Sequence, residues 1–272
     1  MSLRLGFKSE TVLINGVRID FSRKGRGRPF LVIHGEDGYE LDDPGYMSLD
    51  QLTHNNEVFI PRLPGFGRSS LPDFIRSADE VSYIWLDFLD HFDLKDVTVV
   101  AFSVGGWLAL EMASKSCSRI RNLVLCGSVG VKFGGPYDRD IGDIYFHNEA
   151  DVRIMKFHNP ENDPHFRLGG VSKRAALALA RQKEAIVRFC WDPYFHNPSL
   201  RHRLNRITIP TLVVQGVKDG FTLPKYGRAL ARAIPDARYV SIPLAGHFPH
   251  LEQPEKFGAE VASFLSGRRG AN

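Results

Sequence analysis

The sequence has few cysteines, and they follow no regular spacing. Its 272 residues contain only three, Cys117, Cys126 and Cys190. Two of them lie in apolar or helical segments, so their number and placement predict buried free thiols rather than a disulfide framework. Free thiols are typical of a protein in a reducing compartment.

Long apolar runs are also missing. The chain contains no stretch of 18 apolar residues and no apolar leader near its first residue. A membrane-spanning helix needs about 20 such residues, and a secretory leader needs an apolar central region. We therefore expect a cytoplasmic protein without a membrane as a partner.

The chain lacks a strong charge of either sign and shows no pattern of metal ligands. Its 35 Lys and Arg and 31 Asp and Glu leave a formal net charge of +4, with no basic stripe. This balance argues against nucleic acid as a partner. Five histidines lack both paired ligand spacing and a cysteine partner, so we expect no metal site at His147, His158, His165, His196 or His202.

What the chain does contain is an alternation of buried strands and amphipathic helices. Asn15-Gly16, between two apolar stretches, predicts a hairpin because a type I′ turn needs positive φ at both positions. A capping box at Ser77 and Glu80 opens the first helix. A continuous apolar run predicts a strand at residues 30–33, and mainly apolar, β-type segments predict strands at 58–60, 97–100, 120–126, 211–215 and 238–242. The pattern predicts an α/β fold with a mostly parallel central sheet covered on both faces.

Residues 129–206 interrupt this alternation. They are rich in aromatic residues, His and Arg, have few β-branched runs, and include a helical pattern at 173–189. The length of the chain fits one α/β domain with an insertion better than two domains. We expect 129–206 to form a helical cap on a core made of 1–128 and 207–272. Within the cap, Arg188 and Trp191 are the candidates for substrate contacts.

The sequence Ala101-Phe102-Ser103-Val104-Gly105-Gly106 stands between a predicted strand and a predicted helix. A serine with small residues on both sides, at this junction, is typical of a nucleophile elbow. Backbone N–H groups at the start of the helix favour negative charge, which develops on oxygen during acyl transfer. The pattern predicts Ser103 as a nucleophile, although Ala101 stands where glycine is usual.

Two further residues follow late strands and complete a possible triad. Asp219 comes just after the strand at 211–215, and His247 lies in the loop after the last strand. A serine hydroxyl needs a base to take its proton, and that base needs a third group to orient it. Because the carboxyl ends of parallel strands meet at one edge of a sheet, we expect Ser103, Asp219 and His247 to converge there.

These residues and their flanking motifs resemble the α/β-hydrolase superfamily over nearly the whole chain. The resemblance is carried by segments 34–38 (HGEDG), 63–69 (LPGFGRS), 101–106 (AFSVGG), 209–213 (IPTLV) with Asp219, and 246–252 (GHFPHLE). It implies that Ser103 is the nucleophile, His247 the general base and later acid, and Asp219 the group that orients the imidazole. It also implies an oxyanion hole made of the backbone N–H groups of Val104 and Glu36. Two superfamily branches, the haloalkane dehalogenases and epoxide hydrolases, use aspartate at the elbow, so the serine argues against them.

The acidic pair Glu36-Asp37 beside the expected oxyanion hole is less usual. A carboxylate pointing at a developing oxyanion would oppose it, so both side chains should turn away or pair with a cation. We expect Glu36 to contribute only its N–H, with its carboxylate turned outward. The alternative is that Glu36 faces the pocket and binds a substrate amine.

The function implied is hydrolysis by a serine enzyme that needs no metal and no organic cofactor. Its small-molecule substrate would be an ester, thioester or lactone of a small to medium apolar acid, cleaved through an acyl-enzyme. One alternative is hydrolysis of a carbon–carbon bond in a ring-cleavage dienoate, for which Arg188 is the only candidate cation of the pocket. The other is a ligand-sensing protein that has kept the fold without the activity.

Overall fold

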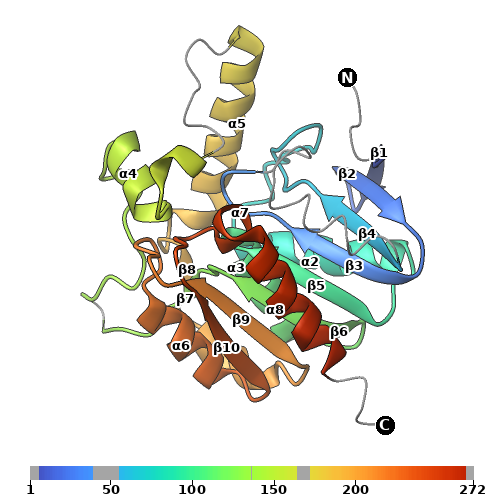
Figure 1. The fold of residues 1–272 in the computed structure, drawn as a ribbon. Coiled ribbons are helices and arrows are strands. Elements are labelled where there is room, and N and C mark those ends of the chain that lie inside the picture. The colour runs from blue at the N-terminus through green and yellow to red at the C-terminus, as the bar shows by residue number, and fades with distance from the viewer. Residues whose placement is uncertain (1–5, 39–54, 136, 164–171, 268–272) are drawn as a thin grey trace.

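The computed structural model describes residues 6–38, 55–135, 137–163 and 172–267, which build a twisted sheet with helices on both faces (Figure 1). The sheet contains eight strands in the order β1-β2-β4-β3-β5-β6-β9-β10. Its strands are β1 (Lys8–Ile14), β2 (Val17–Gly25), β3 (Arg28–Ile33), β4 (Asn56–Pro61), β5 (Val97–Phe102), β6 (Ile120–Cys126), β9 (Thr211–Gly216) and β10 (Ala237–Ile242). Strand β2 is antiparallel to β1 and to β4, and every other pair is parallel. The predicted mostly parallel sheet is confirmed.

The hairpin predicted at Asn15-Gly16 joins β1 to β2. Both residues have positive φ, 46° at Asn15 and 82° at Gly16, as a type I′ turn requires. Ile14 pairs with Val17 across the turn, which sets the register of the two strands.

Helices cover the two faces of the sheet unequally. On one face lie α2 (Ala78–His91), α3 (Val104–Lys115) and α6 (Pro224–Ala233), whose buried side chains form one hydrophobic cluster with the sheet. On the other face lies α8 (Pro254–Ser266), preceded by the short α7 (Pro249–Glu252). Figure 1 shows α8 crossing in front of the sheet. The capping box predicted for α2 is present, since the Ser77 side chain accepts from Glu80 N–H and the Glu80 carboxylate accepts from Ser77 N–H.

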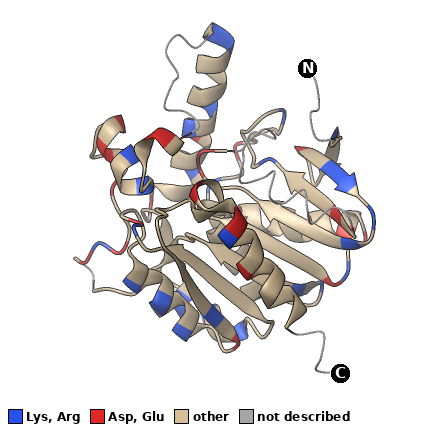
Figure 2. Cartoon of the chain, viewed as in Figure 1, with Lys and Arg blue, Asp and Glu red and all other residues tan. Residues whose placement is uncertain are grey.

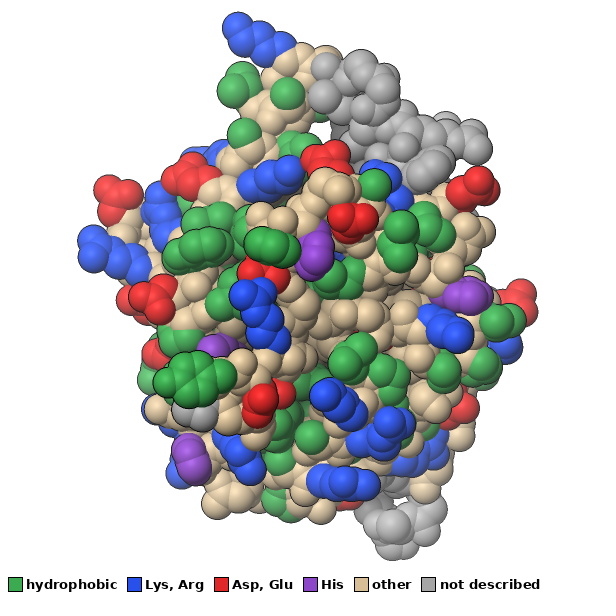
Figure 3. Space-filling model, turned by 90° about the vertical axis from the view of Figure 1, so that its left-hand side faces the viewer, with side chains coloured by type: hydrophobic (Ala, Val, Ile, Leu, Met, Phe, Trp, Pro, Cys, Tyr) green, Lys and Arg blue, Asp and Glu red, His purple; other side chains and the backbone are tan. Residues whose placement is uncertain are grey.

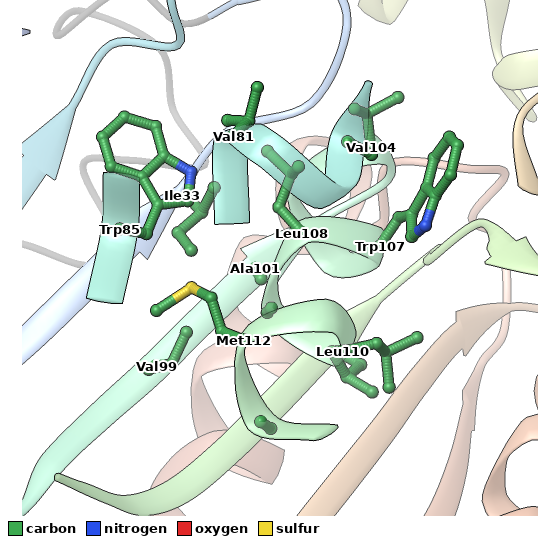
Figure 4. Close-up of a cluster of buried hydrophobic side chains, with 14 of the residues drawn as sticks. Ile33, Val81, Trp85, Val99, Ala101, Val104, Trp107, Leu108, Leu110 and Met112 are labelled. Atoms are coloured by element: carbon green, nitrogen blue, oxygen red, sulfur yellow. The ribbon is translucent and has the colours of Figure 1, made fainter. Parts of the chain in front are cut away.

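Strand β5 shows how one apolar run supplies both cores. Val99 and Ala101 belong to the cluster under α2 and α3, whereas Val100 and Phe102 belong to the cluster under α8. Successive side chains of a strand point to opposite faces, so a strand covered on both sides must be apolar throughout. Figure 4 shows Val99 and Ala101 beneath α3, with Trp107 and Met112 in the same core.

The chain between β6 and β9 forms β7 (Gly130–Val131), α4 (Glu149–Lys156), η2 (Pro160–Asn162), α5 (Lys173–Cys190), β8 (His196–Asn197) and η3 (Leu200–Arg206). Strands β7 and β8 pair in parallel at the base of this excursion. From there α5 rises away from the sheet at the top of Figure 1. The η3 segment packs against α3, and its Leu200 and Leu204 are buried in the core shared with that helix.

Charged side chains are interspersed over the surface. Figure 2 shows both signs of charge on α4 and α8, only Lys and Arg on α6, and few charges on the central strands. Figure 3 shows charges of both signs, with apolar side chains between them, on one side of the molecule. Within the described residues, every helix is too short or too polar to span a lipid bilayer.

Candidate active site

Ser103 occupies a strained turn between β5 and α3. Its φ of 49° and ψ of −116° lie outside the regions that a non-glycine residue normally adopts. Glycines let other segments approach this turn: a Cβ on Gly105 would overlap the carbonyl oxygens of Ile33 and His34, and one on Gly35 would lie 3.0 Å from the Ser103 Cβ. The loop after β3 therefore lies directly against the Ser103 turn.

Ser103, His247 and Asp219 come together in one hydrogen-bonded chain. The Ser103 hydroxyl lies 2.8 Å from His247 Nε2, and His247 Nδ1 lies 2.9 Å from Asp219 Oδ2. None of the three residues is more than 2% exposed. They follow β5, β9 and β10 along the chain, and their side chains meet at the carboxyl edge of the sheet. This arrangement lets the imidazole take a proton from the serine while the carboxylate stabilises its charge.

Four donors hold the Asp219 carboxylate in place. The N–H groups of Phe221 and Thr222 donate to Oδ1 at 2.9 Å each, and the Thr222 hydroxyl donates to Oδ2 at 2.8 Å. The Gln215 side-chain amide donates to Oδ2 as well. A carboxylate fixed on both oxygens cannot turn away from His247, which keeps the imidazole tautomer and orientation that base catalysis needs.

A buried lysine of α4 reaches the acidic pair beside the Ser103 turn. Lys156 Nζ lies 2.6 Å from Glu36 Oε1 and 2.7 Å from Asp37 Oδ2. The Lys156 and Glu36 side chains are only 4% and 3% exposed, whereas that of Asp37 is 45% exposed. The expectation that Glu36 turns outward is therefore wrong. The expected pairing of the acidic residues with a cation is confirmed, because Lys156 supplies the charge that makes an inward carboxylate tolerable.

The pKa values of this pair follow from that contact. Burial alone would raise the pKa of Glu36, but the charge of Lys156 outweighs it and brings the pKa to about 2. Burial likewise opposes charge on Lys156, and Asp37 and Glu36 together raise its pKa above the usual value. Both partners are thus ionised at neutral pH. Nothing in the sequence around Lys156 distinguished it from a surface lysine of an amphipathic helix.

The end of α4 is tied to the loops that carry Asp219 and His247. The His247 N–H donates to the Lys156 carbonyl at 2.6 Å, and the Gly220 N–H donates to the Met155 carbonyl at 2.9 Å. Glu252, buried at the end of α7, accepts from the N–H groups of Gly246, His158 and Asn159. These bonds place the end of α4 over the carboxyl edge of the sheet.

Comparison with known proteins identifies the family. A model of the alpha/beta hydrolase family matches residues 30–260. The chain belongs to this family. It is a hydrolase by that membership, and its fold is the α/β-hydrolase fold.

Two related proteins and one solved structure illustrate the range of similar hydrolases. The 2-hydroxy-6-oxo-6-(2'-aminophenyl)hexa-2,4-dienoic acid hydrolase of Metapseudomonas resinovorans is 27% identical over 93% of this chain and 89% of that protein. A pimeloyl-(acyl-carrier protein) methyl ester esterase of Neisseria meningitidis serogroup A is 26% identical over 78% of this chain and 74% of that protein. The structure of a bacterial membrane phospholipase A, a virulence factor, covers 98% of this chain and 88% of its own with a TM-score of 0.80 and 20% identity.

The two residues predicted to contact substrate, Arg188 and Trp191, contact other residues of this hydrolase. Arg188 donates to Glu184 Oε1 at 2.7 Å and to the Pro72 carbonyl at 3.4 Å. Trp191 is 54% exposed, and its ring packs against Tyr145 and Tyr194. A role for either residue in substrate binding stays a prediction.

The histidines of the segment 129–206 that the structure describes are exposed or contact the backbone. His147 and His202 are exposed, and His196 Nδ1 lies 2.8 Å from the Tyr194 carbonyl oxygen. His165 lies outside the described residues. Within the ranges the structure describes, no group of three His, Cys, Asp or Glu is placed to hold a metal ion.

Buried His34 in the loop after β3 makes the hydrolase sensitive to acid. Its Nε2 accepts from the Leu63 N–H at 3.0 Å, and its Nδ1 lies 2.8 Å from the Gly35 carbonyl oxygen, so the ring is neutral with its proton on Nδ1. Burial lowers the pKa of His34 to about 4. The unfolded chain, with a pKa near 6.5, therefore binds more protons than the native state between these values, and stability falls as the pH falls.

We expect this histidine to remove about 3 kcal/mol of unfolding free energy as the pH falls from about 7 to about 4, with most of the change below pH 6.5. His34→Gln keeps an acceptor and a donor without a titrating ring, so its unfolding free energy should depend less steeply on pH. Urea unfolding at several pH values measures both slopes. His147→Gln, at an exposed histidine, is the matched control and should keep the parental slope. Equal slopes in the parent and in His34→Gln would contradict the assignment.

Proposed function

We propose that this protein is a serine hydrolase that cleaves an ester, thioester or lactone of a small to medium apolar acid. The observation that carries the proposal is the buried chain from Ser103 Oγ through His247 to Asp219, with separations of 2.8 and 2.9 Å. The strained turn supports it, because strain of this kind clusters at active sites. Similarity to a methyl ester esterase supports the same chemistry.

In the proposed reaction Ser103 attacks the carbonyl carbon while His247 takes the hydroxyl proton. The tetrahedral intermediate collapses, the bond to the leaving oxygen or sulfur breaks, and His247 returns the proton to the leaving group. Water then attacks the acyl-enzyme, His247 takes one of its protons, and the acid leaves as Ser103 recovers its hydroxyl proton. The sum is the addition of one water across the acyl bond.

The proposed oxyanion hole consists of the Val104 and Glu36 N–H groups. Val104 is the first residue of α3, where N–H groups have no acceptor within the helix. Glu36 follows Gly35, whose backbone lies against Ser103. Two donors aimed at the developing oxyanion stabilise the transition state more than the ground state.

Carbon–carbon bond hydrolysis of a ring-cleavage dienoate is the second candidate, favoured by similarity to a dienoic acid hydrolase. Such a substrate is anionic and needs a cation near Ser103. Arg188 already binds Glu184 and the Pro72 carbonyl, and Lys156 is already shared by two carboxylates. We therefore prefer ester hydrolysis to carbon–carbon bond hydrolysis as the function of this protein.

Labelling and turnover together test the proposal. An alkyl fluorophosphonate should add to Ser103, seen as a mass shift of the intact protein that Ser103→Ala abolishes. The parent should hydrolyse p-nitrophenyl butanoate. Cleavage of a dienoate without any ester, thioester or lactone turnover would establish the second candidate instead. A protein that neither labels nor turns over any of these substrates would be the non-catalytic sensor.

A further inference from the structure

One oxygen of the Glu36 carboxylate is buried without a partner beside the proposed nucleophile. Oε1 binds Lys156, but Oε2 has no hydrogen-bond partner among the described residues. The Ser103 hydroxyl lies near the Glu36 carboxylate. That hydroxyl, however, donates its proton to His247 at 2.8 Å and so leaves Oε2 unsatisfied. Buried polar atoms in native proteins nearly always have a hydrogen-bond partner, so the unpaired Oε2 indicates that another group binds there.

The charge around Oε2 is negative overall. Lys156 carries one positive charge, which is shared between Glu36 and Asp37, so the three side chains together carry −1. The aromatic rings of Phe221 and Phe248, at 5.3 and 5.5 Å from Lys156 Nζ, enclose the lysine but bring no formal charge. The Asp37 carboxylate is 45% exposed and is solvated, so the buried part of this negative charge is on Glu36, whose free Oε2 is favourable only if a cation or strong donor meets it.

The charge of Glu36 also acts on two groups of the chain that follows β7, Tyr145 and Cys190. Burial, and then the charges of Cys190 and Glu36, raise the pKa of Tyr145 to about 12. Burial, and then Glu36, raise the pKa of the Cys190 thiol. The Glu36 carboxylate is thus close enough to influence these two groups as well as Ser103. A substrate whose carbonyl carbon meets Ser103 would pass within reach of Oε2.

We propose that Glu36 Oε2 binds a protonated amine of the substrate, a few atoms from the bond that is cleaved. The ammonium would donate to Oε2 and neutralise the excess charge of Glu36, Asp37 and Lys156. This inference rests on the proposed ester hydrolysis and replaces its purely apolar substrate by an ester that carries a protonated amine on its acyl side or its alcohol side. An anionic substrate would be repelled by the same carboxylate.

Matched esters test the amine subsite in the parent protein. On the acyl side, ethyl 3-aminopropanoate carries an ammonium where ethyl butanoate carries a methyl group. On the alcohol side, 3-aminopropyl butanoate carries an ammonium where pentyl butanoate carries an alkyl end that is one methylene longer than a methyl group. A charge-assisted hydrogen bond should make kcat/KM of at least one amine ester about tenfold or more higher than that of its neutral partner. Monoethyl succinate, which carries a carboxylate, should be the poorest substrate.

The variants assign the preference to one oxygen. Glu36→Gln should bring the amine-to-neutral ratio of kcat/KM close to one. Asp37→Asn removes the other carboxylate on Lys156 but leaves Oε2 in place, so it should keep the ratio within about threefold of the parent. A ratio near one in the parent, measured by pH-stat at pH 7, overturns the inference whether or not Glu36→Gln folds. If Asp37→Asn lowers the amine-to-neutral ratio of kcat/KM as much as Glu36→Gln does, the inference is also overturned.

Failure of the proposed function is separable from failure of the amine subsite. Neutral esters hydrolysed through Ser103 without an amine preference would leave the function standing and remove the subsite. If no ester is hydrolysed, butylammonium should still slow fluorophosphonate labelling of Ser103 more than 1-pentanol does at equal concentration. If butylammonium and 1-pentanol slow the labelling equally, the amine subsite is overturned. If the fluorophosphonate does not label Ser103 at all, both the proposed function and the subsite are overturned.

Discussion

Replacing Ser103 by alanine is expected to lower kcat for p-nitrophenyl butanoate by about 10⁴-fold or more. The physical reason is that the hydroxyl is the atom that forms the acyl-enzyme, and no other side chain can supply it at that position. Steady-state hydrolysis measured with enough enzyme to see the residual rate gives the ratio. Ser116→Ala, at the C-terminal end of α3, is the matched control and should keep kcat within a few-fold of the parent.

His247→Ala should cost a similar factor, and the double variant should be scarcely slower than either single one. The Ser103 hydroxyl and His247 Nε2 are 2.8 Å apart and share one proton. Without His247 the serine has no base, and without Ser103 the imidazole has no nucleophile to activate. Losses that multiply in the double variant would mean that the two residues act independently. That result would contradict the triad while leaving its geometry intact.

The second large effect is on stability. Replacing Lys156 by methionine should lower the unfolding free energy at pH 7 by about 3–5 kcal/mol, because it leaves the buried Glu36 carboxylate without its counter-charge. Denaturant unfolding followed by circular dichroism measures the loss. Burial without Lys156 should raise the pKa of Glu36, so the difference from the parent should shrink as the pH is lowered and Glu36 becomes protonated.

A second substitution separates the charge from the packing. Lys156→Met combined with Glu36→Gln removes both charges, so it should recover a large part of the lost stability. Lys183→Met, at an exposed lysine 3.8 Å from Glu149, should change stability by no more than about 0.5 kcal/mol. A Lys156→Met protein as stable as the parent would show that the pair contributes nothing to folding.

Much of the fold followed from local patterns. The run of apolar residues at 97–100 predicted a strand covered on both faces, and the structure extends it to Phe102 and divides its side chains between two cores. The capping box at Ser77 and Glu80 predicted the start of α2 to the residue. Such signals are readable because strand alternation, caps and tight turns depend on neighbours within a few positions.

The meeting of Ser103, Asp219 and His247 was also predictable, for a topological reason. Each residue follows a predicted parallel strand, and the carboxyl ends of such strands share one edge of the sheet. The donors that hold Asp219 come mainly from the same short turn, so they too follow from its local sequence.

The orientation of Glu36 was decided only by the tertiary structure. The sequence allowed an outward carboxylate or one that pairs with a cation, and no local pattern identified which cation that would be. Lys156 lies 120 positions away along the chain, on a helix whose pattern is the same whether its lysine reaches water or a buried carboxylate. The amino-acid sequence by itself thus determined the sheet, the strained turn at Ser103 and the meeting of Ser103, Asp219 and His247. The packing of α4 determined the charge beside Ser103, because burial and counter-charge are properties of distant segments brought into contact.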